Sequence, residues 1–160
     1  MKHYPIAVKL ASKSVLVIGG GPVAERKVLS LLETGARVRV ISLTLTPQLL
    51  RLKGLKRISW LKGRVRKKDL AGAKFIIAAT DDRKANKDVS SWAKSKSIPV
   101  NVVDQPSLSS FISPAILRRG KAILAVYTDG KDPVLSRDLK NFLKEQWDEF
   151  ISYRDRLEKG

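Results

Sequence analysis

Three consecutive glycines, Gly19 to Gly21, are followed by Pro22, Val23 and Ala24 in the pattern Gly-x-Gly-x-x-Ala. Gly19 allows a tight turn, Gly21 lets the backbone approach a phosphate without an intervening Cβ, and the small Ala24 allows close helix-strand packing. The pattern is typical of the loop that binds the pyrophosphate of a dinucleotide. A purely structural turn is the alternative, because tight turns also favour glycine.

The elements that must position this loop are a strand before it and a helix after it. Val15 to Ile18 is a continuous apolar run, and the residues after Pro22 have helical apolar spacing that ends at Gly35. A second strand follows at Val38 to Ile41, and strands alternate with helices as far as Val103. This alternation predicts an α/β protein with a Rossmann-type open parallel sheet, formed by a dinucleotide-binding domain of residues 1–103.

The pattern changes after residue 103. Residues 111–117 and 122–127 have the composition of two strands around a turn, and Asp132-Pro133 is typical of the start of a long terminal helix. We therefore expect residues 104–160 to form a small module of a strand hairpin and a helix. Such a module is too small to bury its own core, so we expect it to form a homodimer or to pack against the first domain.

The composition excludes several kinds of chemistry. The 160 residues include no cysteine and a single histidine, His3, so no disulfide, thiol nucleophile or thiolate metal site is expected, and no metal ligand is assigned. No apolar run approaches the roughly 18 residues of a membrane-spanning helix, and the N-terminal residues do not have the pattern of a secretory signal. We expect a cytoplasmic protein with no membrane partner.

The net charge of +17 indicates a polyanionic partner, an anionic surface or adaptation to a particular cytosol. The densest basic stretch runs from Arg51 to Lys68 without an acidic residue, and Trp60 lies inside it. A solvated basic face is favoured over a nucleic-acid surface, because the chain has no recognisable nucleic-acid-binding module. No nucleic-acid partner is therefore expected.

Five motifs follow one another along the chain: Gly19 to Lys27, Ala79 to Asp82, Asn101 to Asp104, Ser110 to Pro114 and Pro133 to Arg137. In this order and spacing they resemble the precorrin-2 dehydrogenase family, which includes the dehydrogenase and ferrochelatase portion of siroheme synthase. The resemblance covers essentially the whole chain. It implies NAD-dependent oxidation of precorrin-2 to sirohydrochlorin, followed in some members by insertion of ferrous iron, which is left open for this chain.

The resemblance also implies roles for particular residues. Asp104, after the fifth predicted strand, matches the family's catalytic aspartate and is our candidate base for proton removal, with a turn-capping role as the alternative. Four basic residues are candidates for binding the carboxylates of the tetrapyrrole substrate, with plain surface charge as the alternative: Arg118, Arg119, Lys121 and Arg137. The candidate NAD-binding residues are Gly19, Gly20, Gly21, Pro22, Val23, Leu43, Thr44 and Thr80.

One feature leaves the choice between NAD and NADP open from the residues alone. The second strand ends Ile41-Ser-Leu-Thr44, without the acidic residue that often binds the ribose 2′-hydroxyl of NAD. The resemblance favours NAD. A nucleotide-sensing or nucleic-acid-binding regulator is the alternative function, in which the dinucleotide-binding unit would act as a ligand switch.

Overall fold

The computed structural model describes residues 3–103 and 105–158, which form two compact units. The first unit is Pro5–Phe111. The second combines His3 and Tyr4 with the chain from Ile112 onward, so the two ends of the chain contribute to the same unit. No helix among the described residues has the length and apolar character needed to cross a membrane.

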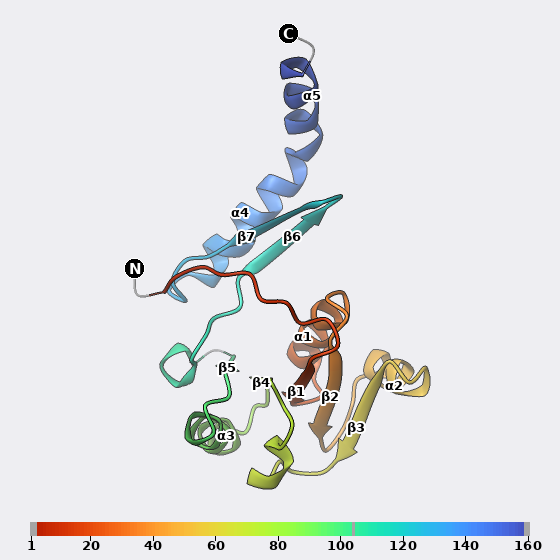
Figure 1. The fold of residues 1–160 in the computed structure, drawn as a ribbon, viewed down its shortest axis with the longest axis vertical. Helices are drawn as coiled ribbons and strands as arrows, with labels where there is room; N and C mark the ends of the chain where they lie inside the picture. Colours follow the sequence, from red (N-terminus) through yellow and green to blue (C-terminus); the bar gives the residue numbers. More distant parts are fainter. Residues whose placement is uncertain (1–2, 104, 159–160) are drawn as a thin grey trace. The chain divides into compact units, whose positions relative to one another are not determined.

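The first unit is built on a five-stranded, wholly parallel sheet with the order β3-β2-β1-β4-β5 (Figure 1). This order confirms the predicted Rossmann-type open sheet, because the strand sequence reverses direction at β1. The loops that follow β1, β2 and β4 lie at the carboxyl ends of these strands. The strands are β1 (Ser14–Ile18), β2 (Arg37–Ser42), β3 (Ile58–Lys62), β4 (Phe75–Ala78) and β5 (Val100–Val102).

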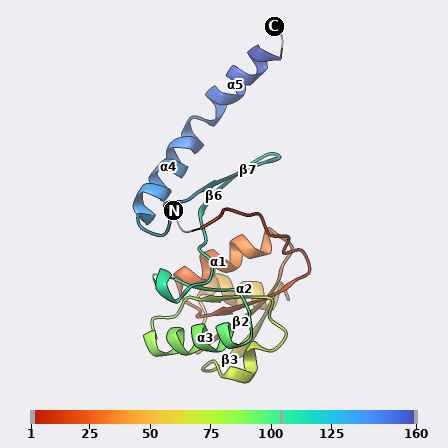
Figure 2. The ribbon, with the colours of Figure 1, turned by 60° about the vertical axis from the view of Figure 1, so that its left-hand side comes forward.

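Helices cover both faces of this sheet (Figure 2). On one face, α1 (Pro22–Leu32) and α2 (Pro47–Gly54) pack over β1, β2 and β3 around a buried apolar cluster that includes Val15 and Val40. On the other face, α3 (Arg83–Ser95) and the short 3-10 helix η1 (Lys67–Leu70) enclose a second cluster that includes Leu16. Two buried layers of this kind explain the nearly continuous apolar strands.

Two polar side chains cap the starts of helices in the first unit. The Thr46 hydroxyl accepts a hydrogen bond from the Leu49 amide at 3.3 Å, and the Asp82 carboxylate accepts one from the Ala85 amide at 3.0 Å. Both caps satisfy amide groups that have no partner within their helices. They also fix the loops that leave the carboxyl ends of β2 and β4.

The segment before Ile112 packs with the first unit, although the predicted domain boundary is after residue 103. The Ser109 and Ser110 hydroxyls accept hydrogen bonds from the amides of Val102 and Val100, each at 2.8 Å. The Phe111 ring lies edge-on to Phe75, with ring centroids 5.8 Å apart. These contacts hold the segment, including the 3-10 helix η2 (Pro106–Leu108), against β5.

The second unit contains an antiparallel hairpin followed by two helices. The hairpin begins at Ala115 and not at Phe111 as predicted, because Phe111 packs in the first unit and Pro114 has no amide to donate. The predicted single terminal helix is divided at Gln146. The elements are β6 (Ala115–Arg119), β7 (Ala122–Val126), α4 (Pro133–Glu145) and α5 (Trp147–Leu157).

The start of the chain is bound to the loop that follows β7. His3 Nδ1 lies 2.6 Å from a carboxylate oxygen of Asp129, and the Tyr127 hydroxyl donates to the same oxygen at 3.0 Å. The His3 and Tyr127 rings meet edge to face, with centroids 6.0 Å apart. Burial and the neighbouring Asp129 carboxylate raise the pKa of Tyr127, so the phenol stays a hydrogen-bond donor.

Candidate functional site

Gly19 occupies a position that only glycine fits. Its φ of +117° is unfavourable for other residues, and a Cβ placed there would lie 2.1 Å from the Ala79 carbonyl oxygen. The Gly19 amide donates to the Ile41 carbonyl at 2.9 Å. The turn after β1 is therefore packed against the ends of both neighbouring strands, β2 and β4.

Gly20 is equally constrained by the loop that follows β2. A Cβ at Gly20 would lie 2.0 Å from the Thr44 carbonyl oxygen and 2.7 Å from the Ser42 hydroxyl oxygen. The Gly20 carbonyl also accepts a hydrogen bond from the Thr46 amide at 3.0 Å. This contact places the loop that contains Leu43 and Thr44 directly beside the glycine turn.

Gly21 differs, because it faces open space. Its backbone is extended, with φ −84°, and a Cβ there would meet nothing within 4 Å. Gly21 is the N-cap of α1, where no side chain forms a capping hydrogen bond and Pro22 has no amide to offer. The first amides of α1, including that of Val23, are therefore available to an anion at the positive end of the helix dipole.

The loop after β2 lies beside this opening, held there by the bond between the Thr46 amide and the Gly20 carbonyl. Leu43 is exposed, whereas Ser42 is buried and both its carbonyl and hydroxyl oxygens receive hydrogen bonds from the Trp60 indole. The Thr46 hydroxyl donates to the Glu25 carboxylate at 2.5 Å, which ties this loop to the first turn of α1. The half-buried Trp60 indole is thus anchored to the end of β2.

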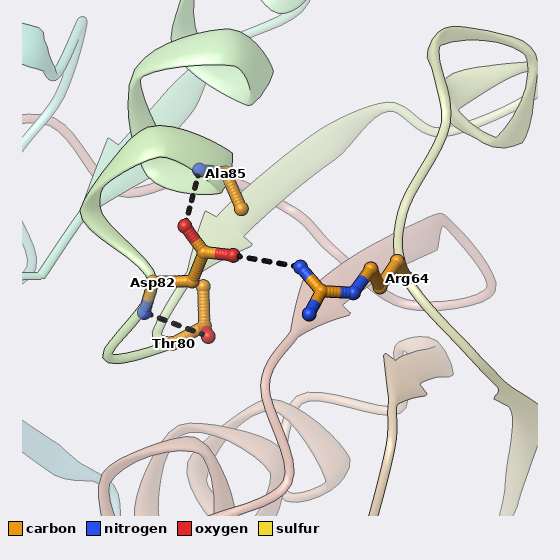
Figure 3. Close-up of polar contacts among 4 residues, drawn as sticks. All are labelled: Arg64, Thr80, Asp82 and Ala85. Carbon is orange, nitrogen blue, oxygen red and sulfur yellow. Dashed lines mark hydrogen bonds and ion pairs between the residues drawn. The ribbon is translucent and has the colours of Figure 1, made fainter.

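The loop after β4 lies on the other side of the glycine turn, because a Cβ at Gly19 would meet the Ala79 carbonyl. Figure 3 shows the polar contacts of this loop. The Thr80 hydroxyl accepts a hydrogen bond from the Asp82 amide at 3.2 Å. The Thr80 carbonyl accepts one from the Asn86 side-chain amide at 2.8 Å. Arg64, from the loop after β3, reaches across to Asp82 with 3.4 Å between Nη1 and Oδ2. Sequence analysis missed Arg64, because it lies in a long basic run that gives no sign of which cation faces the site.

The structure brings the eight predicted cofactor-binding residues together at the carboxyl ends of β1, β2 and β4. Their roles stay predictions, but the residues present fit a dinucleotide. The turn is too crowded for side chains at Gly19 and Gly20, and it is open beside Gly21, where the helix amides lie. Open α/β sheets bind ligands at this edge, where the strand order reverses.

The predicted base, Asp104, lies outside the described residues. Its neighbours continue the end of β5, because the Val103 amide donates to the Ala78 carbonyl at 2.9 Å. The Gln105 amide donates to the Val102 carbonyl at 3.2 Å. The proposed role of Asp104 therefore depends on its place in the sequence, directly after a strand of the sheet.

The four predicted substrate-binding residues lie in the second unit. Arg118 and Arg119 end β6, and Lys121 follows in the turn to β7, so three of the four positions share one end of the hairpin. Arg137 lies on α4, where its hydrogen bond to Asp138 at 2.8 Å and the charge of that carboxylate raise its pKa. Among the described residues, no group of three or more His, Cys, Asp or Glu could hold a metal ion.

Comparison with known proteins identifies relatives for both units. A family model described as "Putative NAD(P)-binding" matches residues 6–115. The siroheme synthase of Thioalkalivibrio sulfidiphilus is 43% identical over 141 residues, and that of Methylobacillus flagellatus is 44% identical over 140 residues. These matches cover 88% of this chain in both cases, but only 29% and 30% of the length of the two relatives.

A solved structure described as "SirC, precorrin-2 dehydrogenase" resembles the whole chain. It is 29% identical, with a TM-score of 0.81, and the match covers 98% of this chain and 78% of that one. The similarity therefore includes the hairpin and terminal helices as well as the parallel sheet.

Proposed function

The chain belongs to the putative NAD(P)-binding family, and from this premise we propose that it oxidises precorrin-2 to sirohydrochlorin with NAD as the hydride acceptor. The single observation that supports this reaction best is the structural similarity to a precorrin-2 dehydrogenase over nearly the entire chain. The alternative of a nucleotide-sensing regulator has no comparable support, since the relatives are named as enzymes.

The glycine turn supplies the cofactor site in this proposal. The backbone amides at the start of α1 bind the pyrophosphate, and the crowded contacts of Gly19 and Gly20 hold the turn in place. Leu43, Thr44 and Thr80 flank the same opening from the loops after β2 and β4. When bound, the nicotinamide accepts a hydride from the substrate, and the chain supplies orientation and the proton acceptor.

Charge complementarity supports a polycarboxylate substrate. The net charge of +17 attracts a tetrapyrrole that carries several carboxylates, and Arg118, Arg119, Lys121 and Arg137 are the proposed local contacts. We also propose a cytoplasmic homodimer joined through the second unit. Its exposed apolar residues support this, because a surface of this kind is typical of an interface: Ile116, Ile123, Val134, Leu135, Leu139, Phe142, Phe150, Tyr153 and Leu157.

Asp104 is proposed to accept the proton as hydride leaves the substrate. The test is an anaerobic assay of Asp104→Asn, because an amide keeps the shape of the side chain but cannot take the proton. Positioned bases contribute about 10² to 10⁴-fold, so sirohydrochlorin formation should fall by that factor while NAD binding stays normal. Asp88→Asn, on α3, is the matched control. Turnover of Asp104→Asn within about twofold of wild type would refute the assignment.

The sequence leaves insertion of ferrous iron open for this chain, with the iron as a substrate. It is tested by adding ferrous iron and sirohydrochlorin anaerobically, without NAD, and following the absorbance change of metal insertion. A rate equal to the spontaneous one would limit the chain to the dehydrogenase step.

A further inference from the structure

An open pocket lies near the amino ends of β1, β2 and β3, on the sheet face that also packs against α3 and η1. Its volume is about 330 Å³, and we call it the arginine pocket. The five residues of β1, which span about 13 Å, separate it from the glycine turn at the carboxyl end of that strand. The pocket is lined by Ser14, Arg37, Val38, Arg39, Ser59 and Ala71.

Strand register places the polar side chains of this pocket on one face of the sheet. Arg37 and Arg39 are two residues apart in β2, so their side chains leave the same face about 7 Å apart along the strand. Ser14 of β1 is paired with Arg37, and Ser59 of β3 is paired with Arg39. The two guanidinium groups are therefore flanked by a serine on each neighbouring strand.

Backbone carbonyls hold both guanidinium groups in place without neutralising their charge. The Arg37 Nε donates to the Ser12 carbonyl at 3.1 Å. The Arg39 Nη2 donates to the Asp69 carbonyl at 2.5 Å and to the Ala71 carbonyl at 3.3 Å. These bonds use only part of each guanidinium, so donor groups of both arginines stay available to a ligand.

The charge of the two arginines is not compensated within residues 3–103 and 105–158. Neither Arg37 nor Arg39 forms an ion pair there, and the buried Nε of Arg39 has no acceptor. The Asp69 carboxylate is bound instead by the backbone amide and the side chain of Arg66. Buried donors and paired cations normally have partners in a folded protein, so this arrangement favours an anionic ligand.

The donors of the pocket fit a phosphate group. A guanidinium binds phosphate through two parallel hydrogen bonds, and serine hydroxyls also donate to phosphate oxygens. A phosphate group has enough oxygens for both arginines, whereas a carboxylate has only two. The hydroxyls of Ser14 and Ser59 have no partner elsewhere in the part of the chain that the structure describes.

The size and lining of the pocket restrict what can be attached to the phosphate. Ligand pockets have volumes of about 300 to 1,000 Å³, so this one is at the lower end and suits a small molecule. No aromatic side chain is found among its described lining residues, so it has no stacking surface for a nucleobase.

We propose that the arginine pocket binds a phosphate group, either as the free ion or as part of a small phosphorylated metabolite. Arg37 and Arg39 contact the phosphate oxygens, and Ser14 and Ser59 donate from either side. The proposal goes beyond the dehydrogenase function and does not depend on it, because the lining residues lie away from the carboxyl ends of the strands.

The test is an NMR titration of the isotope-labelled full-length protein with inorganic phosphate at constant ionic strength. The Arg39 Nε–H signal and the amides of Ser14 and Ser59 should shift and saturate, with half-saturation at about 1 mM phosphate. The amides of Gly21 and Val23 report separately on phosphate at the glycine turn. Added NAD should remove the shifts at Gly21 and Val23 and leave those of the arginine pocket.

Two exposed positions supply the variants. Arg37→Gln keeps most of the side chain and removes its charge, so it should weaken phosphate binding about tenfold. Ser59→Ala should weaken it about threefold through the loss of one hydroxyl. Arg51→Gln is the matched control, because Arg51 is an exposed arginine on α2, which packs on the opposite face of the sheet. It should change the affinity by less than about twofold.

Two further probes distinguish the source of the phosphate and the kind of anion. Tighter binding of glycerol 3-phosphate than of inorganic phosphate identifies a phosphorylated metabolite as the ligand, and the reverse order identifies the free ion. Malonate, which carries two carboxylates, should bind at least about tenfold more weakly than phosphate.

Three outcomes would overturn the proposal. One is a shift that rises linearly with phosphate up to about 20 mM, which would indicate charge screening without a site. Another is an equal effect of Arg37→Gln and Arg51→Gln, and the third is malonate binding as tight as phosphate binding. Protein that binds phosphate in this pocket but does not bind NAD would contradict the dehydrogenase proposal and support this one.

Discussion

The two units bury their apolar residues to very different extents. The Pro5–Phe111 unit has a complete core on both faces of its sheet, with Val15, Leu16 and Val17 wholly buried in β1. In the second unit, Leu117 and Val126 are the buried apolar residues among those the structure describes, while ten large apolar or aromatic side chains, Tyr4 among them, are exposed. The contrast supports the proposal that the second unit packs against a further surface, whereas the first unit buries its apolar residues within its own fold.

The largest effect on the stability of the first unit is expected for Gly19→Ala. The new Cβ would lie 2.1 Å from the Ala79 carbonyl at a φ of +117°, so we expect a loss of about 2–4 kcal/mol in the free energy of unfolding. Chemical denaturation measures it. Gly21→Ala is the control, since its Cβ meets nothing within 4 Å. Equal stabilities for the two variants would mean that the turn is not held by its neighbours.

Gly21→Asp should separate binding from folding within the same turn. The side chain has room, so the thermal unfolding temperature should stay close to that of wild type. A carboxylate beside the amides of α1 should repel the pyrophosphate and weaken NAD binding by about 100-fold. This corresponds to a loss of roughly 3 kcal/mol in the free energy of binding. Gly21→Asn, of the same size but neutral, distinguishes charge from bulk. Unchanged NAD affinity in calorimetry would mean that the glycine turn does not bind NAD.

A polar substitution on α4 tests the incompleteness of the second unit. Phe142 is 56% exposed, and Phe142→Ser should raise the dimer dissociation constant about 10-fold to 100-fold in sedimentation equilibrium. Leu50→Ser on α2 is the control, because Leu50 is 48% exposed on the self-sufficient unit and should not alter association. Wild-type protein that stays monomeric at all micromolar concentrations would contradict the homodimer proposal.

The smallest expected effect concerns the pH dependence of the first unit. Desolvation raises the pKa of Asp69, but hydrogen bonds from the Arg66 backbone and side chain, with the charges of Arg66 and Lys68, lower it below 3.8 overall. A lowered folded-state pKa means that Asp69 stabilises the fold above pH 3.8 and loses this effect as the pH falls through its folded value.

Asp69→Asn should therefore lower the unfolding temperature slightly at neutral pH, by no more than about 2 °C, and leave it unchanged near pH 2. Differential scanning calorimetry at both pH values measures this. If the unfolding temperatures of wild type and Asp69→Asn differed more in acid than at neutral pH, the pH dependence would have the opposite sign. The hydrogen bonds from Arg66 would then not be its cause.

Most of the first unit could be predicted from sequence because its signals are local. Apolar strands, the capping residues Thr46 and Asp82, and the closing Gly35 lie within a few residues of what they control. The resemblance to the precorrin-2 dehydrogenase family is confirmed by the siroheme synthase relatives and the similar solved structure. The family description confirms the NAD prediction at the level of NAD(P).

The errors arose where a distant contact decides the local structure. Phe111 has the pattern of a strand start, but its packing on Phe75 draws it into the first unit. Arg64 is one of many cations in the sequence, and only its contact with Asp82 shows that it reaches from the loop after β3 to the start of α3. Sequence spacing contains no information on either contact.

The bond between His3 and Asp129 has a consequence for biosynthesis and for protein engineering. Residues 5–111 emerge from the ribosome before Asp129 does, whereas His3, which precedes them, must wait for a partner 126 positions later. A purification tag fused shortly before His3 should therefore disturb the carboxyl-terminal helices and hairpin more than the adjacent sheet. Expression vectors for this chain are better built with a long, flexible spacer at the amino end.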